Sequence, residues 1–278
     1  EVAAAVAAQK NVAAPVPVAD IGAKAKAIAT ALVAGERKAI LLGNAAAHHA
    51  RASSLLALAQ WLGAQTGASV GYLTEAANTV GAQWVGAQPQ RGGLNAAQML
   101  AGGLKAAVLF NTEPEFDSAA GGAAAQALSQ AGMVVTLSPF KANMAFSDVL
   151  LPIAPFTETS GTFVNAEGRI QGFHAVVKPL GDTRPGWKVL RVLGNLLEIP
   201  GMDWETSQDV LSAITGAPAG ELDFIPADKL DNSTQAPLVA DTGDSPEPVS
   251  ARIYQLDGLV RRAHALQMTA DAREGGAA

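Results

Sequence analysis

The stretch KAAVLFNTEPEFDSAAGGAAAQALSQAGMVVTLSP, Lys105 to Pro139, sets the class of fold. Two short apolar runs, KAAVLFN and MVVTLSP, stand at its ends, and an alanine-rich segment that opens at Asp117 or Ser118 joins them. Solid apolar runs of this length are typical of strands buried on both faces of a parallel sheet. The alanine-rich segment favours a helix, which its internal glycines weaken. A strand, a helix and a second strand predict a parallel βαβ unit.

The same alternation extends toward the N-terminus. Strands are predicted over residues 38–44 and 68–74, and helices over residues 20–36, 48–67 and 95–103. Asp20 and Asn95 are the expected N-caps of the first and last of these helices, because their side chains can accept from free helix N–H groups. We therefore expect an α/β fold with a Rossmann-like, doubly wound and mostly parallel sheet.

The pattern changes after Ser138. Residues 146–156 form a short extended segment interrupted by prolines, and residues 161–179 alternate like a β-hairpin with a turn near Asn165 to Gly168. Helices are predicted over residues 184–197, with Pro185 in the first turn, and over residues 204–216. The sequence thus predicts a small hairpin and a helical C-terminal extension beside the α/β sheet.

The expected organisation has three parts. Residues 1–19, rich in Ala, Val and Pro, are predicted as a linker, and residues 20–198 as the α/β domain. Residues 199–278 are predicted as a helix, an acidic Pro-rich arm over 217–250, and a C-terminal docking segment. Because the first residue is Glu and not Met, we expect a processed chain or a fragment.

Composition excludes several classes of protein. Hydrophobic residues make up 49% of the 278 residues, enough for a sizeable core. The formal charge of −6 argues against a nucleic-acid partner, which needs clustered Lys and Arg. The absence of cysteine removes disulfides, thiolate catalysis and cysteine-ligated zinc or iron–sulfur clusters. Since no apolar run reaches about 18–20 residues, we expect no insertion into a membrane.

Familiar catalytic motifs are weak here. Gly67 to Gly71 matches the nucleophile elbow G-x-S-x-G, but a predicted helix precedes it and a strand follows, the reverse of the elbow's context. His48 and His49 are adjacent and cannot share a metal as an i, i+4 pair would, and His174 and His264 stand alone. No strand is followed by a glycine-rich phosphate-binding motif. We predict no catalytic residue and no metal ligand.

Two kinds of segment remain as candidates for ligand contact. Gly43, Asn44 and Asn111 follow predicted strands, where ligands bind in open α/β sheets, although ordinary turn residues are slightly favoured there. The stretch ETSGTFVNAEGRIQ, Glu158 to Gln171, crowds polar residues into the predicted hairpin. A solvated hairpin and a ligand-binding loop are both compatible with these residue types.

Three successive motifs resemble the molybdopterin oxidoreductase family. The first, A-D-V-x-L-P, is matched by Asp148, Val149, Leu151 and Pro152. The second, E-x-x-G-T-x-x-N-x-E-G-R-x-Q, is matched by Glu158, Gly161, Thr162, Asn165, Glu167, Gly168, Arg169 and Gln171. The third, a helix start A-R-P-x-W, is matched by Arg184, Pro185 and Trp187. The agreement spans about forty residues and is highly specific.

Three further stretches are similar to the large iron–sulfur subunits of NADH-quinone oxidoreductase, respiratory complex I. They are LTEAANTVGAQWVGAQP, LFNTEPEFD and DGLVRRAHALQMTADAR. This resemblance implies the C-terminal region of such a subunit, which keeps the molybdopterin-enzyme fold without a cofactor, while the iron–sulfur clusters lie in the N-terminal part. The implied partners are other peripheral-arm subunits, on the cytoplasmic side of the bacterial inner membrane.

The resemblance also marks residues that descend from a pterin-binding loop. They are Asn111, Thr112, Glu158, Thr162, Asn165, Glu167 and Arg169. In a scaffold domain these residues are structural, with Glu167 and Arg169 expected to hold the hairpin by ion pairs or hydrogen bonds. Two alternatives stay open. One is a molybdopterin-binding fragment of a formate- or nitrate-type oxidoreductase, with Asn111, Thr112, Asn165 and Arg169 on pterin or phosphate. The other is a stand-alone cytosolic α/β binding protein.

Overall fold

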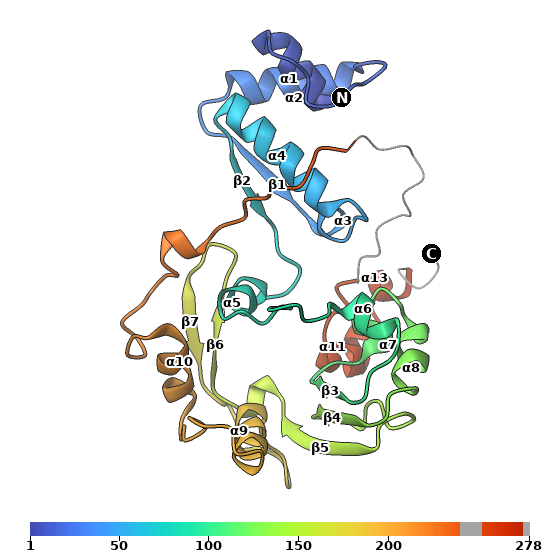
Figure 1. Cartoon of the computed structure of the whole chain (residues 1–278), viewed down its shortest axis with the longest axis vertical. Helices are drawn as coiled ribbons and strands as arrows, with labels where there is room; N and C mark the ends of the chain where they lie inside the picture. Colours follow the sequence, from blue (N-terminus) through green and yellow to red (C-terminus); the bar gives the residue numbers. More distant parts are fainter. Residues whose placement is uncertain (240–251, 275–278) are drawn as a thin grey trace. The chain divides into compact units, whose positions relative to one another are not determined.

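The chain folds into two compact units (Figure 1). The structure is a computed structural model that describes residues 1–239 and 252–274. Unit 1 comprises Glu1–Glu75 and Pro226–Ser250, and unit 2 comprises Ala76–Ile225 and Ala251–Ala278. Part of the predicted acidic arm, with Asp241, Asp244 and Glu247, lies outside the described residues.

Unit 1 is a small α/β unit. Its elements are α1 (Val2–Lys10), α2 (Ala23–Ala34), β1 (Ala39–Leu42), α3 (Asn44–Ala47), α4 (Ala52–Thr66), β2 (Ser69–Tyr72) and the short 3₁₀ helix η2 (Ala227–Lys229). The two strands are parallel, with Ala39 opposite Ser69 and Leu42 opposite Tyr72. Helix α4 runs from one strand toward the other, so the predicted strand–helix–strand order is confirmed.

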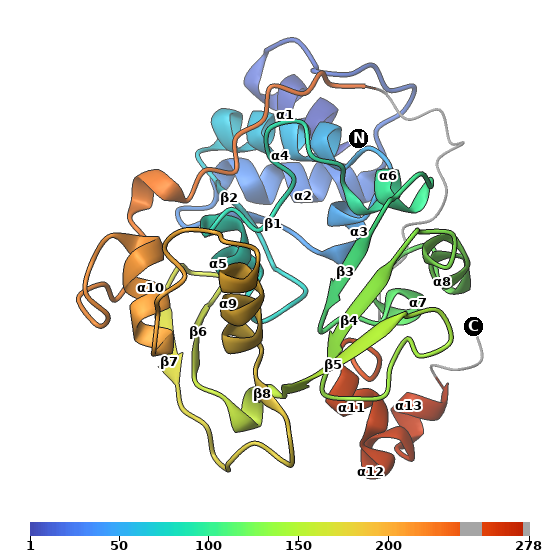
Figure 2. The ribbon, with the colours of Figure 1, turned by 60° about the horizontal axis from the view of Figure 1, so that its bottom comes forward.

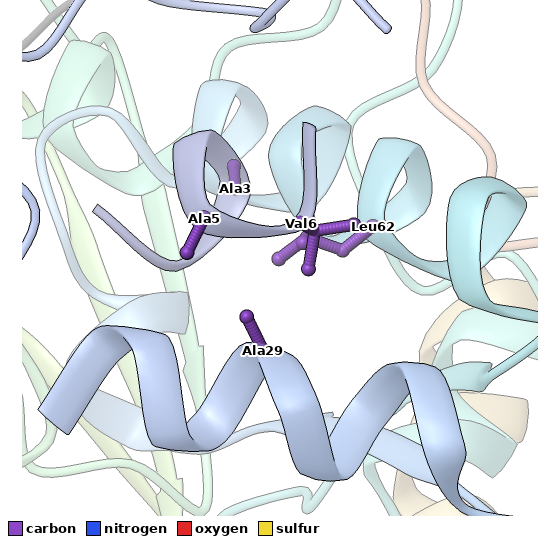
Figure 3. Close-up of a cluster of buried hydrophobic side chains, with 5 residues drawn as sticks. All are labelled: Ala3, Ala5, Val6, Ala29 and Leu62. Carbon is purple, nitrogen blue, oxygen red and sulfur yellow. The ribbon is translucent and has the colours of Figure 1, made fainter. Parts of the chain in front are cut away.

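Small side chains form the core of unit 1. Val6 and Ala29 are fully buried where α1 packs on α2, and Leu62 of α4 closes the cluster (Figure 3). Alanine lets the helices approach closely, and burial stabilises a helix whose own hydrophobic pattern is weak. The prediction of a linker over residues 1–19 is therefore wrong for residues 2–10, which form α1 and carry part of this core.

Helix α2 is capped differently from the prediction. It begins after Gly22, not at Asp20, and the backbone N–H of Gly22 donates to Oε2 of Glu1 at 2.9 Å. The first residue of the chain thus supplies a carboxylate at this helix start. Gly67 ends α4 with a left-handed φ of 73°, as its position predicted. Ser69 then begins β2, so no strand precedes the G-x-S-x-G match.

Unit 2 contains the main sheet and the hairpin. Its helices are α5 (Thr79–Trp84), α6 (Ala96–Leu100), α7 (Pro114–Asp117), α8 (Gly122–Leu128), η1 (Phe156–Glu158), α9 (Gly186–Leu196), α10 (Ser207–Thr215), α11 (Gly258–Arg262), α12 (His264–Gln267) and α13 (Ala270–Glu274). Its strands are β3 (Ala107–Phe110), β4 (Val134–Ser138), β5 (Val149–Ala154), β6 (Gly161–Val164), β7 (Ile170–Phe173) and β8 (Arg184–Pro185). Figure 2 shows the main sheet beside the hairpin.

The main sheet is parallel throughout, in the order β3-β4-β5-β8. Burial on both faces, which the apolar runs predicted, holds for the central strand β4, where Val134 and Leu137 are almost wholly buried. It does not hold for β3, an edge strand whose Val108 is 61% exposed. Phe110, which points to the same face as Val108, is 44% exposed, whereas Leu109 on the opposite face is only 9% exposed, so just one face of β3 is covered.

The segment between β3 and β4 forms two helices instead of one. The first is the short α7, which ends at Asp117; the Oδ2 of Asp117 accepts from the N–H of Glu113, at the start of the same helix, at 2.7 Å. Gly121 then adopts a φ of 54°, which interrupts the helix, and α8 begins at Gly122. The predicted start at Asp117 or Ser118 is therefore wrong by several residues.

Two further local predictions for unit 2 are confirmed, whereas Pro185 lies before the first turn of α9, as its N-cap, and not within it. Asn95 forms a capping box with Gln98 at the start of α6. Strands β6 and β7 pair antiparallel, with Val164 opposite Ile170 across the predicted turn. The molecule is thus an α/β protein with parallel sheets, a hairpin and a helical C-terminal segment, although the parallel strands are divided between two sheets.

The predicted acidic arm is docked where it is described. Asn232 donates from Nδ2 to the carbonyl of Val70 at 3.1 Å and accepts at its own carbonyl from Gln60 at 2.6 Å. The N–H of Val239 donates to Ser54 Oγ at 2.9 Å. This segment therefore returns to unit 1 and completes it. No helix in the two described ranges is long and apolar enough to cross a membrane.

Candidate site at the ends of the parallel strands

A crevice of about 290 Å³ lies in unit 2 at the carboxyl ends of β3, β4 and β5. Asn111 and Thr112 follow β3, Ser138 ends β4, and Pro155 follows β5. These are the positions where open α/β sheets bind ligands. The start of α11, at Asp257 and Gly258, forms another wall.

Arg261 of α11 reaches from that wall into an ion-pair cluster. Its Nη1 donates to Asp117 Oδ1 at 2.8 Å and its Nη2 to Glu113 Oε1 at 3.3 Å. The side chain is only 9% exposed, and its guanidinium lies 5.0 Å from the ring centre of Phe116. Burial acts to lower the pKa of Arg261, but the hydrogen bond and charge of Asp117 outweigh it and raise that pKa.

Arg262 completes the cluster from the neighbouring position. Its Nη1 and Nη2 donate to the two carboxylate oxygens of Glu113 at 2.7 and 2.9 Å, a bidentate arrangement. The same guanidinium lies 4.0 Å from the ring centre of Phe140. The hydrogen bond from Arg262 holds the pKa of Glu113 below its ordinary value of 4.5, against the opposing effect of burial.

This lowered pKa predicts acid sensitivity of the C-terminal segment. A carboxylate with a depressed folded-state pKa stabilises the fold fully above pH 4.5, and that contribution is lost as the pH falls through the folded pKa. We expect hydrogen exchange in residues 252–274 to rise below about pH 4.5, after correction for intrinsic rates. Glu113→Gln should flatten this pH dependence and Glu115→Gln, an exposed neighbour, should not; equal profiles for both variants would contradict the assignment.

Three backbone N–H groups around the crevice are already bound within the chain. The N–H of Glu113 donates to Asp117, that of Phe140 to Ser138 Oγ, and that of Asn111 to the carbonyl of Leu137. A phosphate-bearing cofactor needs such donors free at strand ends and helix starts. The lining also carries three carboxylates, Glu113, Asp117 and Asp257, against the single guanidinium of Arg261.

The molybdopterin cofactor implied by the family resemblance does not fit these residues. Its phosphates would meet an acidic wall whose cation is already paired, and the N–H groups of Asn111, Glu113 and Phe140 are already bonded within the chain. Within residues 1–239 and 252–274 no group of three or more His, Asp or Glu side chains is placed to hold a metal ion. In the described crevice the guanidinium of Arg261 is neutralised by the carboxylates of Glu113 and Asp117, which belong to the same chain.

The hairpin residues lie apart from this crevice, and Asn165 organises their turn. Its Oδ1 accepts from the N–H groups of Glu167 and Arg169 at 3.0 and 2.9 Å. Its own N–H and carbonyl pair with Arg169 and Gly168, and Gly168 adopts a left-handed φ of 83°. The side chain of Asn165 thus supplies an acceptor for two backbone N–H groups that the tight turn leaves without a backbone partner.

Asn165→Ala should loosen this hairpin. The change leaves two N–H groups without their acceptor, and we expect a loss of about 1–2 kcal/mol in the free energy of unfolding. Urea denaturation followed by far-UV circular dichroism measures it. Glu167→Ala, an exposed side chain in the same turn, is the control and should stay within about 0.5 kcal/mol. A neutral result for Asn165→Ala would show that solvent replaces its oxygen without cost.

The other hairpin candidates have structural contacts. Arg169 does not pair with Glu167 in the described structure; its guanidinium lies 4.4 Å from the ring centre of Phe224, which also bridges to it through the backbone. Glu158 accepts from the N–H of Leu180 at 2.9 Å. Thr162 lies opposite Gly172 in the β6–β7 ladder.

Of the seven predicted site residues, only Asn111 and Thr112 line the crevice, while Asn165, Glu167 and Arg169 meet in the hairpin turn. Sequence reasoning missed Glu113, Asp117 and Arg261, which make the charge cluster in the crevice. The available signal was an acidic pair at i, i+4 after a strand, together with adjacent arginines near the C-terminus. Those features are common on solvated surfaces, so they did not single out a site.

The histidines of unit 1 also have local partners. His48 Nε2 lies 2.7 Å from Glu75 Oε2, and His49 Nδ1 accepts from the N–H of Arg51. The contact between His48 and Glu75 could not be predicted from the sequence, because α4 and β2 separate the two residues along the chain.

Comparison with known proteins agrees with the fold and the motifs. Residues 12–196 match the molybdopterin oxidoreductase family. Proteins named "Putative formate dehydrogenase" from Staphylococcus aureus strains USA300 and NCTC 8325 are 36% identical over 108 residues, which is 36% of this chain and 10% of each relative. The homologue from strain RF122 shows the same identity and coverage. The chain spans about a tenth of the length of the curated relatives it matches. Because the family match covers well over half of the residues, this chain belongs to the molybdopterin oxidoreductase family.

Proposed function

We propose that this chain is the C-terminal scaffold region of the large iron–sulfur subunit of NADH:quinone oxidoreductase, respiratory complex I. Electrons would pass from NADH to quinone through centres held elsewhere, and this region would carry no redox centre. The observation that supports the proposal best is the Arg261–Glu113–Asp117 cluster, in which the guanidinium that lines the strand-end crevice is paired with two carboxylates of the chain and not left for a cofactor's phosphates.

The proposed partners are other peripheral-arm subunits on the cytoplasmic side of the bacterial inner membrane. The iron–sulfur clusters would belong to the N-terminal part of the subunit. In this arrangement the hairpin residues serve the fold: Asn165 closes a turn, and Arg169 packs on Phe224. The stretches LTEAANTVGAQWVGAQP, LFNTEPEFD and DGLVRRAHALQMTADAR supply the sequence support.

A second function is favoured by the relatives named as formate dehydrogenases. In that case the chain is a fragment of a formate-type molybdopterin enzyme, and Asn111 and Thr112 contact the pterin or its phosphate. This alternative requires α11 to move, because Arg261 lies in the same crevice.

Metal and pterin analysis of the full-length parent protein, purified from its native source, separates the two functions. Iron and sulfide without molybdenum or tungsten, together with NADH:quinone activity in the purified assembly, are the expected results. Stoichiometric molybdenum or tungsten with a pterin, and oxidation of formate, would overturn the scaffold proposal in favour of the second function.

A further inference from the structure

We propose that the segment Leu256–Arg262 is a built-in plug that closes the strand-end crevice of unit 2. It stands where an open α/β sheet receives its ligand. Five of its residues line the crevice directly: Leu256, Asp257, Gly258, Leu259 and Arg261. The inference concerns this chain's own residues and does not depend on membership of complex I.

Charge complementarity holds the plug against Glu113, Asp117 and Phe140, the residues after β3 and β4 that we call its seat. The guanidinium of Arg261 contacts both Asp117 and Glu113, while Arg262 grips Glu113 through both oxygens. Glu113 is 13% exposed and Arg261 is 9% exposed, so water competes little for these bonds. Two carboxylates of the seat therefore bind two arginines of the plug, and removing either partner would leave a buried charge without its counter-ion.

Shape complementarity is equally close. A Cβ placed on Gly258 would lie 3.2 Å from Glu113 Oε1 and 3.2 Å from Phe140 Cε2. The helix start therefore approaches the loops after β3 and β4 as closely as a glycine allows. A residue larger than alanine at this position adds further atoms next to Glu113 and Phe140 and therefore crowds both side chains.

The plug is also braced from its far side. Gln267 of α12 donates from Nε2 to the carbonyls of Tyr254 and Val260 at 3.0 and 2.8 Å. Asp257 caps α11 by accepting from the N–H groups of Leu259 and Val260. The conformation of the C-terminal segment is thus supported by hydrogen bonds within the segment itself, in addition to its contacts with the crevice.

A single buried thiol reports whether the plug closes the crevice. The chain has no cysteine, and Ser138 lines the crevice while only 4% exposed, so Ser138→Cys provides one reporter. Its reaction with 4,4′-dithiodipyridine, a small neutral reagent, is followed in the full chain. Arg261→Ala with Arg262→Ala should accelerate labelling about ten- to hundredfold, because the closing ion pairs are gone.

The direction of this effect is diagnostic. Removing two cations raises the pKa of a nearby thiol and by itself slows its reaction, so faster labelling reports opening of the plug. Ser69→Cys, an exposed reporter at the start of β2 in unit 1, is the control and should label at the same rate with and without the arginine changes.

Two further variants test the proposal if the double variant fails to fold. Gly258→Val should accelerate labelling of the Ser138→Cys thiol by crowding the seat. Glu113→Gln with both arginines in place should accelerate it by removing the charge that Arg261 and Arg262 both contact. An unchanged labelling rate of the Ser138→Cys thiol in those variants that remain folded would overturn the proposal. None of these results bears on the metal and pterin content of the parent protein, so the two proposals can fail separately.

Discussion

Val6→Asp is expected to unfold unit 1. Val6 is fully buried among Ala3, Ala29 and Leu62, and the described side chains of that cluster are apolar and cannot pair with a carboxylate. Burying an unpaired charge, or neutralising it by an upward pKa shift, should cost about 4 kcal/mol or more. The loss is measured as a shift of the urea midpoint, with hydrogen exchange in α2 and α4 showing which unit opens.

Val12→Asp provides a matched control for this change. Val12 follows α1 and is 43% exposed, so the same substitution there should stay within about 0.5 kcal/mol. If the two variants were equally stable, α1 would not be part of the folded core, and residues 1–19 would behave as the linker that their composition predicted.

Leu137→Ala should cause the largest loss in unit 2. Leu137 is fully buried in β4, which pairs with β3 on one side and with β5 on the other. Removing a leucine side chain at such a site leaves a cavity and should cost about 2–5 kcal/mol. Urea denaturation gives the free energy, and exchange of the β3 and β5 amides locates the loss.

Leu180→Ala makes the same chemical change on the surface. Leu180 is 78% exposed in the loop between β7 and β8, so its truncation should change stability by less than about 0.5 kcal/mol. A comparable loss in both variants would mean that the loop, and not the β4 core, limits the stability of unit 2.

Much of the fold could be predicted because its signals are local. The apolar runs of β3 and β4, the turn around Asn165 and the capping box at Asn95 are each specified by a few consecutive residues. Burial of a strand is a different matter, since it depends on which of its two faces other elements cover. That is why β4 and β3 look alike in sequence but differ in exposure.

The features that were missed depend on distant partners. Helix α1 has an alanine and valine composition that also suits a linker, and packing against α2 and α4 stabilises it. Arg261 and Glu113 stand 148 positions apart, so neither residue alone indicates an ion pair. Asn111 was indicated by the general rule about strand ends and Thr112 by the family resemblance, whereas the charge cluster around them required the structure.

The interleaved course of the chain has a consequence for its synthesis. Unit 1 is completed by Asn232, 162 positions after its partner Val70, and the crevice of unit 2 is closed by Arg261. At about 5–20 residues per second, the first strands of unit 1 wait on the order of ten seconds on the ribosome for that returning segment. Each unit lacks contacts made by its C-terminal segment until that segment is synthesised, so both units reach their final structure only late in translation.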